Sequence, residues 1–101
     1  MAIVQASIVP IGVGTSLSNY LSRALSVLEK RKELKYQLTP MGTVIEGDLD
    51  SVLSVIKQMH ESVFGDDVRR VYTVIVIDDR RDKAATMESK VSSVQQKLRA
   101  K

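Results

Sequence analysis

The chemically most suggestive part of this chain is residues 38–48, where hydroxyl and carboxylate side chains collect around a predicted turn. Pro40 and Gly42 are typical of a tight turn, because proline fixes φ and glycine tolerates positive φ. Residues 43–46 then form a predicted apolar strand, and Asp48 is suited to cap a following helix. A carboxylate and two threonines at one strand end are more typical of a small-molecule site than of core packing.

Glu46 is the sharpest individual candidate in that stretch. A partly buried carboxylate there would accept hydrogen bonds from an exocyclic amine or a ring N–H, which is one way to hold an aminopyrimidine. The alternative is an ordinary solvated side chain at a strand end. A role as general base has no support, because no partner acid, nucleophile or metal set accompanies Glu46.

A second candidate set consists of short polar side chains on the predicted strands. Counting alternation strand by strand, we expect these residues to share the sheet face away from the helices: Ser7, Gln37, Thr39, Thr43 and Thr73. Hydroxyls and an amide can bind a polar heterocycle without the cost of desolvating a charge. The alternative is that threonine simply suits strands.

Three further clusters give weaker signals. Residues 12–16 contain two glycines and two hydroxyls, as a phosphate-binding loop does, but they lack the lysine of a P-loop. The preferred interpretation is therefore a turn into a helix that Thr15 or Ser16 caps. Arg80 and Arg81 suit bidentate anion binding, or else a salt-bridged subunit contact. A lone histidine, His60, and no cysteine give no metal site.

Composition bounds the class of protein. With 101 residues, 44% of them hydrophobic, we expect one globular domain over residues 1–101. No apolar run approaches the ~20 residues of a membrane span, and no signal peptide is visible, so a cytoplasmic location is expected. The net charge of +3 comes from basic residues interleaved with acidic ones. That pattern argues against nucleic-acid binding.

Hydrophobic periodicity predicts a βαββαβ order followed by a third helix. Strands are expected at 2–9, 35–39, 43–46 and 71–77, with helices from Thr15 or Ser16 to about Lys32 and from Leu49 to about Phe64. A narrow apolar stripe defines the third helix: Met87, Val91, Val94 and Leu98. This order predicts an α+β, ferredoxin-like fold with a four-stranded antiparallel sheet and an extra C-terminal helix.

Residues 71–77 form the strongest strand signal, and both faces of that strand are apolar. In the ferredoxin-like plan it lies at a sheet edge, where an uncovered apolar strand promotes aggregation. Either the third helix or another subunit must cover it. We therefore expect a homo-oligomer, a dimer or a tetramer.

Several motifs together resemble the small thiamine-binding-like family. They are Pro10-x-Gly12-x-Gly14-Thr15-Ser16-x-Ser18-x-Tyr20, the block from Tyr36 to Asp48 with its Thr43-x-Ile45-Glu46-Gly47 core, His60-Glu61, and Asp79-Arg80-Arg81-Asp82-Lys83. The resemblance spans nearly the whole chain. It implies a ferredoxin-like fold, dimers or tetramers, no established catalytic activity, and binding of thiamine or its hydroxymethylpyrimidine moiety. It also makes Ser18, Thr43 and Glu46 the leading ligand contacts, with Tyr20 and Thr39 secondary.

The leading functional hypothesis is therefore a non-catalytic binding protein for thiamine or its pyrimidine, with no cofactor beyond that ligand. The alternative is an anion-responsive regulatory or structural oligomer in which Arg80 and Arg81 hold sulfate or phosphate. An RNA-binding module is disfavoured, because residues 2–9 and 43–46 carry no aromatic side chain on which bases could stack.

Overall fold

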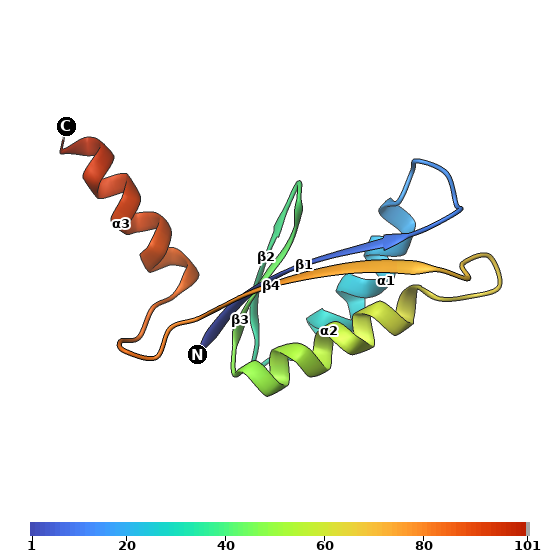
Figure 1. Cartoon of the computed structure of the whole chain (residues 1–101), viewed down its shortest axis with the longest axis horizontal. Helices are drawn as coiled ribbons and strands as arrows, with labels where there is room; N and C mark the ends of the chain where they lie inside the picture. Colours follow the sequence, from blue (N-terminus) through green and yellow to red (C-terminus); the bar gives the residue numbers. More distant parts are fainter. Residues whose placement is uncertain (101) are drawn as a thin grey trace.

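The structure, a computed structural model, describes residues 1–100 as a four-stranded β-sheet with three helices (Figure 1). The elements in chain order are β1 (Ala2–Pro10), α1 (Ser18–Glu29), β2 (Lys35–Thr39), β3 (Gly42–Gly47), α2 (Leu49–Val63), β4 (Val71–Asp79) and α3 (Met87–Arg99). This is the predicted βαββαβ order with an additional C-terminal helix.

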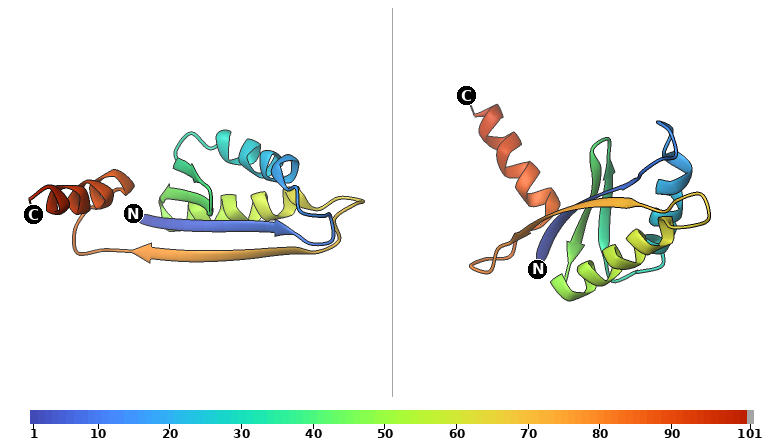
Figure 2. Two further views of the ribbon diagram at one scale, coloured as in Figure 1. Left: turned by 90° about the horizontal axis from the view of Figure 1, so that it is seen from above. Right: turned by 45° about the vertical axis from the view of Figure 1, so that its right-hand side comes forward.

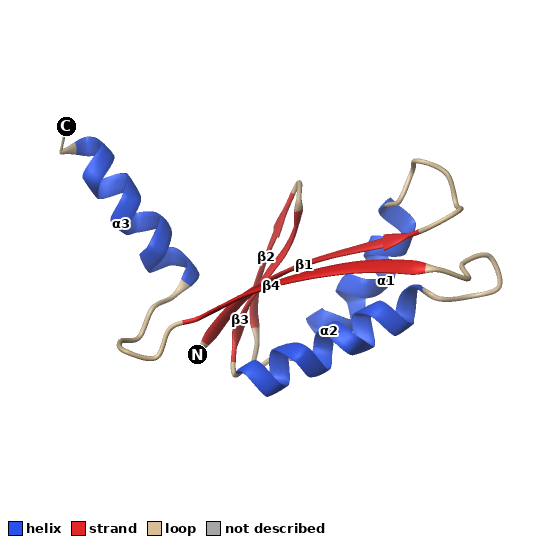
Figure 3. Ribbon diagram, in the orientation of Figure 1, coloured by secondary structure: helices blue, strands red, loops and turns tan. Residues whose placement is uncertain are grey.

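The sheet has the strand order β2-β3-β1-β4, and each neighbouring pair is antiparallel. The two central strands are therefore β1 and β3, and β4 lies at an edge as predicted. Helices α1 and α2 lie side by side on one face of the sheet, whereas α3 stands apart from them (Figures 2 and 3). The predicted α+β, ferredoxin-like fold is confirmed.

The core lies between the sheet and the two packed helices. Along β1 every second residue is buried, which is the period-2 pattern of a strand with one covered face. The core residues from the strands include Val4, Ala6 and Ile45, and those from the helices include Leu28 and Ile56. Because register pairs Val4 with Ile45, both side chains point toward the helices.

The start of α2 agrees with the sequence, and the limits of α1 do not. Asp48 caps α2, because its carboxylate accepts the Ser51 N–H at 3.2 Å. The prediction that Thr15 or Ser16 caps α1 is wrong. The loop containing Gly12 and Gly14, both with φ of 88°, extends further, and α1 begins at Ser18 without a side-chain cap.

The predicted end of α1 near Lys32 is also wrong, since the helix ends at Glu29. The chain turns there, and the Leu34 N–H donates to the Arg31 carbonyl at 3.1 Å. That turn delivers Leu34 into the core, where it is buried against the sheet. Burial of Leu34 thus favours a helix end at Glu29, before the polar residues 30–32 that the sequence predicted as helical.

Two apolar surfaces remain uncovered within the described chain. One is β4, whose residues from Tyr72 to Ile77 are exposed on both faces except for Thr73. The other is α3, whose stripe of Val91, Val94 and Leu98 faces solvent while only Met87 is buried. Within residues 1–100, no helix has both the length and the apolar character needed to cross a membrane.

Candidate functional site

A cavity of about 220 Å³ lies where the β2–β3 hairpin tip meets α1. Its walls are mostly aliphatic, and polar atoms enter from the hairpin and from β1. The lining comprises Ala6, Ser7, Ile8, Val9, Leu17, Leu21, Ala24, Leu25, Leu38, Thr39, Pro40, Met41, Gly42, Thr43 and Met59. Two of the predicted site residues, Thr39 and Thr43, therefore meet in one cavity.

Thr43 is the polar residue that this cavity leaves available. It pairs with Ala6 of β1, so its side chain points toward the helices, and it is only 7% exposed. Within residues 1–100 its hydroxyl has no hydrogen-bond partner, yet no unpartnered side-chain oxygen there is sealed from solvent. The Thr43 hydroxyl is therefore free to bond with a molecule in the cavity.

Thr39 has a different role, because its hydroxyl is already engaged. It donates to the Gly42 carbonyl at 2.8 Å and accepts the Met41 N–H at 3.3 Å. Ser7 adds a bond from its hydroxyl to the Met41 carbonyl at 2.9 Å. These bonds fix the hairpin tip that roofs the cavity.

Gly42 is also needed to keep the hairpin tip in place against β1. A Cβ at that position would lie 2.8 Å from Ser7 Oγ and 2.9 Å from the Ala6 carbonyl oxygen. Both distances are shorter than a carbon atom tolerates, so a larger residue would push the tip away from β1. The residues around the turn thus hold the hairpin tip over the cavity. Sequence reasoning identified these residues only as a turn.

The prediction that five polar residues share the face away from the helices is wrong. Register places Thr43 opposite Ala6 and Thr73 opposite Ile8, so both lie on the helix-covered face. Ser7, Gln37 and Thr39 lie on the other face, which we call the open face. The error arose because alternation fixes faces only within a strand, and the pairing of strands sets how the faces correspond.

Glu46 lies on the open face, away from the cavity that contains Thr43. Its carboxylate accepts the Met87 N–H at 3.1 Å, and the residue is 3% exposed. Met87 is the first residue of α3, so the carboxylate sits at a helix N-terminus, where the helix dipole stabilises negative charge. The structure therefore gives this carboxylate a partner within the chain.

The two residues implied by family resemblance on α1 are separated from each other. Ser18 lies in a shallow groove on α1 that shares Leu21, Leu25 and Leu38 with the cavity. Tyr20 points elsewhere, and its hydroxyl donates to Asp67 at 2.7 Å. This bond raises the pKa of Tyr20 and lowers that of Asp67.

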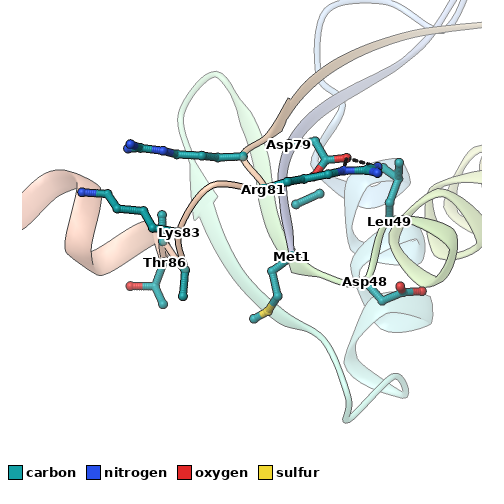
Figure 4. A pocket seen from close by; sticks show the side chains of 11 residues that line it. Met1, Asp48, Leu49, Asp79, Arg81, Lys83 and Thr86 are labelled. Atoms are coloured by element: carbon teal, nitrogen blue, oxygen red, sulfur yellow. Dashed lines mark hydrogen bonds and ion pairs between the residues drawn. The ribbon is translucent and has the colours of Figure 1, made fainter.

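Arg80 and Arg81 line another cavity, of about 440 Å³, at the end of the sheet where β4 leads toward α3 (Figure 4). Each guanidinium is already paired. Arg80 Nε lies 2.5 Å from Asp82, and Arg81 reaches Asp79 at 2.7 Å. Through these bonds the pKa values of both aspartates fall below their ordinary range. An anion would have to compete with these carboxylates.

Sequence reasoning did not identify the leucines of the cavity wall as candidate site residues. Leu21 and Leu25 belong to the apolar stripe of α1, and periodicity cannot show which stripe positions leave a gap. Within residues 1–100, no group of three or more His, Asp or Glu side chains is placed to hold a metal ion. The cavity between the β2–β3 hairpin tip and α1, which we call the helix-side cavity, is the candidate site that combines an apolar lining with a free hydroxyl.

Comparison with known proteins places this chain among relatives that match it nearly end to end. The YqgV protein of Bacillus subtilis is 47% identical over 102 residues, covering 97% of this chain and 98% of the relative. The MJ1052 protein of Methanocaldococcus jannaschii is 41% identical over 92 residues, covering 91% and 90%. A crystal structure of MJ1052 superposes with a TM-score of 0.86, at 40% identity, covering 94% and 96%.

A more distant solved structure, a candidate thiamine biosynthesis/salvage protein from Thermotoga maritima, has a TM-score of 0.76 at 22% identity, covering 92% of this chain and 97% of that one. This likeness shows the shared fold. The model of the family described as thiamine-binding protein matches residues 4–95. The chain therefore belongs to the thiamine-binding protein family.

Proposed function

We propose that this chain is a non-catalytic binding protein for thiamine or its hydroxymethylpyrimidine moiety, and that the helix-side cavity takes the pyrimidine ring. Membership of the thiamine-binding family supports the ligand class. The observation that carries the choice of cavity is Thr43, a residue only 7% exposed that belongs to the mostly aliphatic lining, and whose hydroxyl has no partner among residues 1–100 and is not sealed from solvent.

The chemistry of the cavity suits a small neutral ring. Within the described chain its lining contains no charged side chain, so a charged group would lose its hydration there without compensation. Its volume of about 220 Å³ lies below the ~300 Å³ at which pockets for drug-sized ligands begin, which favours a single ring. The thiazolium half of thiamine would then extend outward along α1, past Ser18.

In this proposal the predicted contacts divide into groups. Thr43 bonds directly to the ligand, Thr39 holds the roof, and Ser18 lies at the rim. Glu46 and Tyr20 are assigned to contacts within the protein, because each already has a hydrogen-bond partner outside the cavity. No side chain with an acid–base or nucleophilic partner lines the cavity among residues 1–100, which supports binding without catalysis.

We also propose that the protein is a cytoplasmic homo-oligomer. The observation that supports the oligomer is β4, an edge strand with apolar side chains exposed on both faces. The second candidate function, an anion-responsive oligomer, has its support in the cavity lined by Arg80, Arg81 and Lys83. It is second because both arginines are paired with aspartates.

Calorimetric titration with thiamine, its pyrimidine and thiazole halves, and sulfate tests these proposals against each other. We expect saturable binding of thiamine and of the pyrimidine. Thr43→Val removes one neutral hydrogen bond at nearly constant volume, so affinity should fall by about 0.5–1.5 kcal/mol, or two- to tenfold.

Thr73→Val is the control for the same replacement on the same face of the sheet, since Thr73 lies outside the cavity, where its hydroxyl oxygen is 2.6 Å from His60 Nδ1. It should leave the affinity for the pyrimidine unchanged. Binding of sulfate with no response to thiamine or its halves would favour the anion-responsive oligomer. Equal affinities of the parent and Thr43→Val proteins for the pyrimidine would contradict the assigned cavity.

A further inference from the structure

The first turn of α3 is attached to a single row of residues that crosses the open face of the sheet. Register aligns Lys35 of β2 with Glu46 of β3, Glu46 with Ile3 of β1, and Ile3 with Asp78 of β4. The three polar members of this row each bind α3. Lys35 pairs with Glu88 at 2.9 Å, Glu46 accepts the Met87 N–H at 3.1 Å, and Asp78 pairs with Lys90.

Beyond this attachment α3 has no cover. Its remaining turns project away from the sheet (Figures 1 and 2). Val91, Val94 and Leu98 recur at helical spacing on one side of the helix and are 56–60% exposed. An apolar stripe on a helix gains stability only when it packs against another surface.

The open face of β4 is a second uncovered apolar surface, formed by Tyr72, Val74 and Val76. These residues are 44–59% exposed. They span about 13 Å at the rise of a strand, and the stripe from Val91 to Leu98 spans about 10 Å at the rise of a helix. The two surfaces thus match in length and in apolar character.

We propose that α3 is an exchanged arm, whose stripe packs on the open face of β4 in a second copy of this chain, while the second copy's α3 packs on the first. The attachment across the row from Lys35 to Asp78 directs each α3 away from its own β4 face. A two-fold arrangement covers both surfaces in both copies, since each copy offers the same pair of surfaces. This inference rests on the homo-oligomer proposed above and names its contact.

Charge substitution on α3 tests the contact first. Val94→Asp places a charge in the stripe, so the oligomer seen in sedimentation at micromolar concentration should dissociate to smaller species. Gln96→Asp is the matched control, because position 96 lies on the opposite side of α3, and it should sediment like the parent. Retained assembly in the Val94→Asp protein would overturn the proposal.

Cross-linking then tests the exchange itself, and the chain suits it because it contains no cysteine. Val94→Cys and Val74→Cys proteins, mixed and oxidised, should form a covalent heterodimer on a denaturing gel. The pair of Gln96→Cys and Val74→Cys should form far less.

A doubly substituted chain, Val94→Cys with Val74→Cys, separates exchange from folding back. Exchange yields covalent dimers, whereas an internal disulfide in a monomer would overturn the proposal by showing that α3 folds onto its own sheet. An oligomer without any cross-link would overturn the exchange alone, and a monomeric parent would overturn the oligomer as well. The binding of the pyrimidine, on the opposite face, should persist in the Val94→Asp protein.

Discussion

The two faces of the sheet are formed by the same strands but are covered differently. On the helix-covered face α1 and α2 bury the alternating apolar residues of β1 and β3, and they leave the cavity that Thr43 lines. On the open face a charged row attaches α3, and apolar side chains of β4 stay exposed. The covered face is thus suited to hold a small molecule, and the open face to meet another chain.

This difference explains why neighbouring residues on β3 have unrelated roles. Thr43 and Ile45 point toward the helices, whereas Val44 and Glu46 point toward the open face. Residues that are neighbours in the sequence of β3 therefore lie on opposite faces of the sheet and cannot all belong to one site. Substitutions at adjacent positions of β3 offer a direct way to test the contrast.

The largest expected effect comes from Ile45→Ala. Ile45 is fully buried in the core, so truncation leaves a cavity and should lower the free energy of unfolding by about 2–5 kcal/mol. Val44→Ala, one residue away on the open face and only partly buried, should cost less than about 1 kcal/mol. Urea denaturation of both variants measures the difference. Equal losses would show that the open face is packed as tightly as the helix-covered face.

A smaller effect is expected from Glu46→Gln. The change replaces a charge-assisted hydrogen bond to the Met87 N–H with a neutral one, so about 1–1.5 kcal/mol of the attachment of α3 should be lost. Amide hydrogen exchange should accelerate in the first turn of α3, and the affinity for the pyrimidine should stay unchanged. A tenfold weaker affinity with α3 still protected would instead place Glu46 in contact with the ligand.

The smallest expected effect is the loss of stability at acidic pH. The hydrogen bond and ion pair with Lys35 hold the pKa of Glu88 below its ordinary value of 4.5. Because the folded-state pKa is the lower one, the stabilisation is present above pH 4.5 and is lost as pH falls through the lowered pKa. Both side chains are exposed, so the change in stability should be slight.

An NMR titration of the Glu88 side-chain carboxyl carbon tests this pair. We expect a midpoint below 4.5 in the parent, and a midpoint nearer the ordinary value in a Lys35→Met protein. A parent midpoint at the ordinary value would show that the pair does not persist in solution. That result would leave Glu46 and Asp78 as the attachments of α3.

Sequence reasoning predicted the features that depend on local chemistry. The order of strands and helices, the edge position of β4 and the cap by Asp48 all follow from periodicity and turn residues. It did not predict features that depend on distant contacts. The partner of Glu46 lies 41 residues away on α3, and the face of Thr43 depends on its pairing with Ala6. Neither can be derived from the spacing of residues along one strand.

Mapping the ligand by NMR chemical-shift perturbation tests the central claim most directly, because it separates the three candidate regions in one titration. With hydroxymethylpyrimidine we expect the largest changes at Thr43, Leu21 and Leu25, which line the helix-side cavity. Changes centred on Glu46 and Met87, or on Arg80 and Arg81, would contradict the assignment of the ligand to that cavity.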